Sequence, residues 1–280
     1  MHLTMVVFII MLAWMIRVMV SPDPGNSPHR WGESLLSFVV PPLLLLTTAL
    51  SIVCMGPRGN MVVPWEGWFS YGLAWAFLAT SVGLLLYLAW RSGLALYQIH
   101  TLPEASVQGM AARLLTTDLP YSAQVGFWQP HLVVSQGLLQ QLDPDHLASV
   151  VIHEQAHAYY HDTFWCFWLG WLKRLTFWLP HSQTLWEEIT FLRELRADAW
   201  ATQRINRFIL AESLVQVAKS PWITDDIISV PFSCATAQGR LAQRIDLLLT
   251  EAHPLAEPRP LHWLAIAPVL IPLLMIPFHH

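Results

Sequence analysis

The chain has 280 residues, of which 54 % are hydrophobic and only 12 % are charged, and its mean hydropathy is +0.42. This composition indicates a membrane protein, and the 15 tryptophans, many near the ends of apolar runs, are typical of anchors at the membrane–water interface. The net charge of −4 gives no basic excess, so nothing in the composition indicates binding to nucleic acid.

Four apolar segments are interpreted as transmembrane helices. They are residues 3–20, 35–55, 68–90 and 261–280. A helix of about 20 residues crosses a hydrocarbon core of roughly 30 Å, and each segment approaches that length. A buried core helix is the alternative for each segment, above all for the proline-rich last one. A signal peptide is a further alternative for the first, which however lacks a basic leading region and a small-residue cleavage site.

Residues 91–260, between the third and fourth segments, are expected to form one domain large enough to bury its own core. They carry 12 of the 15 Lys and Arg residues of the chain. Because positively charged segments tend to stay inside, the domain is expected in the cytoplasm, with residues 1–90 forming three spans and both chain ends outside.

Within this domain, residues 121–128 and 131–135 are expected to form two short strands of a small sheet. The edge of such a sheet is suited to aligning an extended substrate by main-chain hydrogen bonds. The remainder is expected to be helical, with a last helix over about 236–250. The predicted fold class is therefore a mainly α polytopic membrane protein with about four transmembrane helices and a cytoplasmic α+β domain.

Residues 164–179 are rich in aromatic side chains yet contain Lys173 and Arg174. One membrane crossing here would place the two halves of the domain on opposite sides of the bilayer. We therefore interpret the segment as an interfacial or shallowly re-entrant amphipathic helix, with a buried domain helix as the alternative.

The stretch HEQAH at residues 153–157 is the strongest chemical signal. On a helix, His153 and His157 stand four residues apart on one face, so both imidazoles can bind a single Zn²⁺. Glu154 lies beside the first histidine, where it can act as general base on the attacking water. Asp143 and Pro144 upstream are typical of a helix N-terminus.

A catalytic zinc site requires a third protein ligand, for which Glu194 is the best candidate. Asp198 lies four residues further on, so the same helix offers a second, supporting carboxylate. Asp162, five residues after His157, is suited to orienting a ligand imidazole. A solvated, charge-paired helix is the alternative reading of Glu194 and Asp198, and it leaves Glu187 or Glu188 as the third ligand.

Together these motifs resemble a known group of proteins. The patterns are HExxHxxxxD at 153–162, RExxAD at 193–198, and the run GFWQPHLVVSQGLL at 126–139. In this order they are similar to gluzincin-type integral-membrane zinc metallopeptidases, in particular the beta-lactam sensor antirepressor peptidases. The heat-shock and CAAX prenyl-protein membrane proteases are more distant. The chain stops at residue 280 after its last apolar segment, so we do not expect the extracellular sensor domain of the beta-lactam sensors.

The resemblance implies a zincin-like domain in which His153, His157 and Glu194 bind zinc, with Glu154 as base and Asp198 as the companion of Glu194. It also suggests Arg244, in the short motif RIDLL, as a residue that acts on the transition state or supports the structure. The related proteases have the same cytoplasmic orientation of the catalytic domain.

We therefore expect a multi-pass plasma-membrane zinc endopeptidase, of bacterial type, that cleaves a transcriptional repressor or a membrane protein for regulated proteolysis or quality control. The expected partners are a protein substrate and the lipid bilayer, without nucleic acid, and homo-oligomerisation stays open. The alternative is a non-hydrolytic membrane signalling or assembly module that retains a protease fold. A binding-only site has no need of Glu154, which favours the enzyme.

Overall fold

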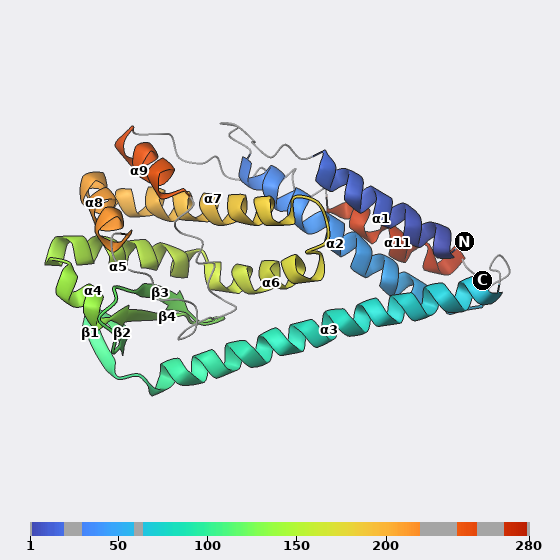
Figure 1. Ribbon diagram of the computed structural model, residues 1–280, viewed down its shortest axis with the longest axis horizontal. Helices are drawn as coiled ribbons and strands as arrows, with labels where there is room; N and C mark the ends of the chain where they lie inside the picture. The colour runs from blue at the N-terminus through green and yellow to red at the C-terminus, as the bar shows by residue number, and fades with distance from the viewer. Residues whose placement is uncertain (1, 20–29, 59–63, 219–239, 251–265, 279–280) are drawn as a thin grey trace. The chain divides into compact units, whose positions relative to one another are not determined.

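The computed structural model describes residues 2–19, 30–58, 64–218, 240–250 and 266–278, and it is mostly helical with one small mixed sheet (Figure 1). The chain divides into two compact units, and each is described by itself. The first comprises residues 1–87, 171–189 and 256–280, and the second comprises residues 88–170 and 190–255.

The first unit is built around helices α1 (His2–Val18) and α2 (Arg30–Met55), which pack against each other. Ile9, Leu44, Leu45 and Val269 form one of its apolar clusters. Hydroxyl groups within α2 donate to backbone carbonyls one turn earlier, as Thr48 Oγ1 does to Leu44 O at 2.7 Å. Such internal hydrogen bonds let polar side chains sit in an apolar helix without an unpaired group.

Within the described residues, two helices are long and apolar enough to cross a membrane: α2 and α3 (Pro64–Thr101). The apolar part of α2 is 56 % buried inside the protein, whereas that of α3 is only 17 % buried, so α3 exposes most of its apolar side chains. Helix α1, with 17 residues, is shorter and lies at the lower limit of the length of a full span. Helix α3 also extends well beyond the predicted segment 68–90.

A continuous C-terminal helix over 261–280 is not confirmed. Residues 261–265 and 279–280 lie outside the described residues. The described part forms three short pieces, Ala267–Leu270, Ile271–Leu274 (α11) and Ile276–Phe278. A proline occurs in each piece, and its missing N–H interrupts the helical hydrogen-bond ladder. The predicted last domain helix is α9 (Leu241–Leu249), while residues 236–239 are also outside the description.

The second unit contains a four-stranded sheet in the order β1-β2-β4-β3. Its strands are β1 (Glu104–Val107), β2 (Met110–Leu115), β3 (Ser122–Val125) and β4 (His131–Ser135). β4 matches its predicted bounds, β3 is shorter than predicted, and β1 and β2 were not predicted. β2 runs parallel to β4, and the other two pairs are antiparallel. β1 and β3 are therefore the edges.

Two turns set the shape of this sheet. Gln108 and Gly109 join β1 to β2 with φ values of 51° and 78°, the two left-handed positions of a tight hairpin turn. Gly126 follows β3 with φ 145°, and a Cβ there would lie 2.8 Å from Gln129 O. Only glycine fits this position without displacing the backbone that leads into β4.

The second unit also contains helices α4 (Gln136–Gln141), α5 (Pro144–Tyr159), α8 (Arg207–Ala218) and α9. Parts of α3, α6 (Asp162–Leu175) and α7 (Ser182–Thr202) belong to it as well. Helix α5 packs against β3 and α8 (Figure 1). Its N-terminus is as predicted, because Asp143 accepts hydrogen bonds from the N–H groups of Asp145 and His146. Leu132, Val134, Val150 and Val151 belong to the core that fixes α5 on the sheet.

A candidate metal centre

The two histidines of HEQAH lie on one face of α5 and point toward each other. Their Nε2 atoms are 3.2 Å apart, and the ring planes meet at 88°. Both residues are almost completely buried, at 7 % and 9 % exposure. The apolar neighbours Val150, Val151 and Ala156 hold this part of the helix in the core, so the two rings meet in a site shielded from solvent.

Glu194 on α7 supplies a carboxylate to the same point. Its Oε2 lies 3.3 Å from His153 Nε2, and its Oε1 lies 3.6 Å from His157 Nε2. The three potential ligand atoms are all within 4.8 Å of one another. Ligands of a tetrahedral ion with bonds of about 2.0–2.1 Å are separated by roughly 3.3 Å, which is close to these separations. The group is therefore suited to hold a metal ion.

Carboxylates also lie behind both imidazoles. His157 Nδ1 is 2.7 Å from Asp162 Oδ2, and His153 Nδ1 is 3.0 Å from Asp198 Oδ1. The first contact is a hydrogen bond, whereas the second falls outside hydrogen-bond angles. Carboxylates in this position orient a ligand ring and keep its other nitrogen free for the metal. Asp162 and Asp198 thus lie where the sequence analysis expects supporting carboxylates.

Three arginines contact these carboxylates. Arg244 on α9, itself only 3 % exposed, donates from Nε and from one terminal nitrogen to the two oxygens of Asp198, both at 2.8 Å. Its other terminal nitrogen is 3.1 Å from Glu194 Oε2. Arg193 donates to Glu194 Oε1 at 2.6 Å, and Arg196 pairs with Asp162. Sequence reasoning missed Arg193 and Arg196, although both flank Glu194 in the RExxAD motif.

The electrostatics keep Glu194 charged. Burial by itself raises the pKa of Glu194, but His157, Arg244 and Arg193 outweigh it and hold the pKa well below its usual range. Burial lowers the pKa of His153, whereas Asp198 and Glu194 raise it, and the net value is about 9. A metal ion requires neutral imidazole, so at neutral pH it competes with a proton at His153.

Glu154 lies next to this group on α5 and is 8 % exposed. Ser122 on the edge strand β3 donates a hydrogen bond from Oγ to Glu154 Oε1 at 3.0 Å. Tyr121 is the preceding residue, and burial together with the charge of Glu154 raises the pKa of its phenol. Sequence reasoning missed Ser122, because the contact depends on how the sheet packs against α5.

The other acidic candidates for a third ligand are engaged elsewhere. Glu188, in the first unit, accepts a hydrogen bond from Arg30 Nε at 2.9 Å. Glu187 is exposed and accepts a hydrogen bond from Gln183 at 2.6 Å. Among the described residues, the group that gathers potential metal ligands consists of His153, His157 and Glu194.

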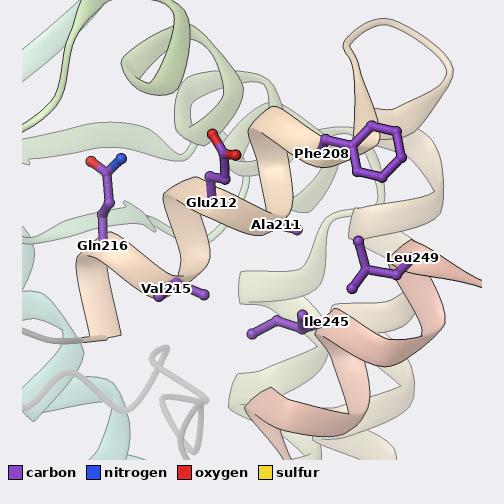
Figure 2. Close-up of a pocket in the computed structure, with 7 residues that line it drawn as sticks. All are labelled: Phe208, Ala211, Glu212, Val215, Gln216, Ile245 and Leu249. Atoms are coloured by element: carbon purple, nitrogen blue, oxygen red, sulfur yellow. The ribbon is translucent and has the colours of Figure 1, made fainter.

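A separate groove in the second unit lacks a group of potential metal ligands among its described lining residues. It has a volume of about 350 Å³ and lies between α8 and α9 (Figure 2). Its lining is mainly apolar and consists of Phe208, Ala211, Glu212, Val215, Gln216, Ile245 and Leu249. Glu212, its one charged residue, contacts His146 Nε2 at 3.1 Å. The candidate site is therefore the metal-ligand group rather than this groove.

No family model, curated protein or solved structure matches this chain. The resemblance to membrane metallopeptidases therefore stays an expectation from the motifs.

Proposed function

We propose that this protein is a membrane-associated zinc endopeptidase of the gluzincin type, with His153, His157 and Glu194 as ligands and Glu154 as general base. The observation that carries the proposal is the convergence of one carboxylate and two imidazoles, from α5 and α7, at separations close to those of a tetrahedral site. Two imidazoles and one carboxylate are the ligand set of several zinc peptidases, which leave the fourth position open.

The chemistry proposed is hydrolysis of a peptide bond. A bound Zn²⁺ supplies Lewis acidity and lowers the pKa of a water toward about 7. Glu154 takes a proton from the water whose oxygen adds to the scissile carbonyl carbon, and passes it to the departing amine nitrogen as the C–N bond breaks. Asp162 orients His157 through a hydrogen bond and Asp198 lies against His153, while Arg244 and Arg193 hold the acidic side chains in place.

The proposed substrate is a protein at or near the membrane, either a cytoplasmic regulator or a membrane protein. The presence of α2 and α3, both long and apolar enough to cross a bilayer, supports a membrane location. The distribution of Lys and Arg favours a cytoplasmic catalytic domain. The edge strand β3 lies beside Glu154 and is suited to pairing with an extended substrate.

Glu154→Gln tests the proposal. We expect the purified variant in detergent to keep about one zinc per chain, because the ligands are intact. Its cleavage of fluorescently labelled casein should fall by about 10²–10⁴-fold, the contribution typical of a positioned general base. Glu212→Gln, the same change on α8, is the matched control and should retain activity. Near-normal cleavage by the Glu154→Gln protein would show that Glu154 is not the general base, whereas a zinc-loaded wild type that does not cleave casein would favour the non-hydrolytic membrane module.

A further inference from the structure

We propose that Ser122 is a positioning residue that holds the Glu154 carboxylate in the orientation needed for proton transfer. The inference rests on the proposed function and adds a residue outside the HExxH and RExxAD motifs. Ser122 Oγ donates a hydrogen bond to Glu154 Oε1 at 3.0 Å. Among the described residues, no other hydrogen bond to the Glu154 side chain occurs. This bond fixes the orientation of the carboxylate and leaves Oε2 without a hydrogen bond from the described residues, so Oε2 is the more accessible oxygen for a proton.

The backbone around Ser122 is held firmly, so its hydroxyl has a defined position. Ser122 pairs with Val134 in the antiparallel β3–β4 ladder. The preceding residue, Tyr121, accepts a hydrogen bond from Ser135 N–H at 2.9 Å and donates one to Ser135 Oγ at 2.8 Å. Ser135 is fully buried and also caps α4. The strand therefore presents the hydroxyl from a rigid element, as a positioning group requires.

The need for an anchor follows from the position of Glu154. It is adjacent to His153 on α5, and its side chain has several rotatable bonds. A glutamate without a partner samples several rotamers, and only some of these direct an oxygen toward the reacting water. A hydrogen bond to a carboxylate is stronger than one between neutral groups, so one hydroxyl is enough to favour a single orientation.

The test compares Ser122→Ala with Ser122→Thr, which retains a hydroxyl and suits a strand. The zinc-loaded proteins are assayed in detergent on fluorescently labelled casein. We expect kcat of the alanine variant to fall by about 10- to 100-fold with little change in KM, and the threonine variant to recover most of the loss. Ser106→Ala, the same change on the exposed opposite edge strand β1, is the matched control and should have no effect.

Two further measurements separate positioning from a purely structural role. In the Glu154→Gln background, Ser122→Ala should cause no additional loss, because the residue acts through the carboxylate. Acetohydroxamate is the second probe, since its hydroxyl proton must pass to a well-placed base when it binds the zinc-loaded protein. Its affinity should fall about 5- to 10-fold in Ser122→Ala and should be normal in Ser106→Ala, while zinc content stays at the wild-type level.

An active wild type whose Ser122→Ala variant cleaves casein as fast as Ser106→Ala would overturn the inference and leave the proposed function intact. Equal losses in Ser122→Ala with and without Glu154 would also overturn it, because the serine would then act independently of the base. A wild-type protein that holds zinc but neither cleaves casein nor binds acetohydroxamate would overturn the proposed function, and this inference with it.

Discussion

Two buried groups of ionisable side chains on helix α7 differ in the kind of partner that each glutamate meets. In the first unit, Glu188 of α7 meets Arg30, and a carboxylate faces a guanidinium, so each charge has its counterpart. In the second unit, Glu194 of α7 faces His153 and His157, and three groups that can all act as metal ligands point toward one another. The first arrangement is complete as a pair, whereas the second is suited to hold a metal ion. Buried charge alone therefore does not identify a metal site. Side chains that can all act as metal ligands and that point toward one another do.

The largest expected effect separates the two glutamates of α7. Glu194→Ala should abolish stoichiometric zinc binding, because it removes one of three protein ligands. Glu188→Ala should keep about one zinc per chain but lose about 3–5 kcal/mol of stability, since Arg30 is left buried without this carboxylate. Metal analysis of the purified proteins and their thermal unfolding in detergent measure both effects. Normal zinc affinity in Glu194→Ala would mean that another residue is the third ligand. The two glutamates would then not differ in their effect on zinc binding.

A smaller effect concerns the carboxylates behind the imidazoles. Asp162→Asn should lower zinc affinity by about 10- to 100-fold without eliminating binding, because an amide orients His157 Nδ1 less well than a carboxylate does. Competition with a fluorescent zinc chelator measures the affinity. Asp145→Asn, an acidic residue in the first turn of α5, is the control. An unchanged affinity in Asp162→Asn would mean that the ring is held by its packing alone.

Much of this centre could be predicted from local spacing. His153, Glu154 and His157 lie within about one helical turn. Asp143 and Pro144 mark where that helix begins, so two independent local signals predict the same helix. Glu194 required a chemical argument, namely that two imidazoles need a third ligand. The contact of Ser122 with Glu154 could not be predicted from the sequence. The two residues are 32 positions apart, and the contact depends on how β3 packs against α5.

The sheet shows the same division between local and distant determinants. The run His131–Ser135 contains buried Leu132, Val133 and Val134, and its β-branched residues predicted β4 correctly. Strand β1 reads Glu104-Ala-Ser-Val107, with little β propensity, and forms because the Gln108-Gly109 turn folds it onto β2. For the C-terminal segment, hydropathy predicted a helix, whereas the prolines at 268, 272 and 277 divide its described part into short pieces.

The smallest expected effect comes from an ionic contact near the surface, which contrasts with both buried arrangements. His146 contacts Asp143 at 2.7 Å and Glu212 at 3.1 Å. Burial lowers the pKa of His146, but these carboxylates outweigh it and raise the pKa above its ordinary value. The stabilisation is therefore fully present below about pH 6.5 and is lost as the pH rises through the raised value.

His146→Gln should remove this pH dependence, with a change of only about 1–2 °C in Tm, because exposed pairs contribute little. Thermal unfolding of the wild type and the variant between pH 5 and 9 provides the measurement. A pH dependence that persists unchanged in His146→Gln would assign it to other groups, and then the comparison between surface and buried contacts would need a different example.

For the proposed protease, the shortness of strand β3 has a consequence for selectivity. With four residues, Ser122–Val125, it offers a partner only a few main-chain hydrogen bonds. Contacts of this number discriminate poorly between amino-acid sequences. A protease that works through such an edge cleaves whatever unfolded segment is held near it for long enough. Tethering to the same bilayer raises the effective concentration of a segment, so cellular co-location, more than a recognition motif, would decide which proteins are cut.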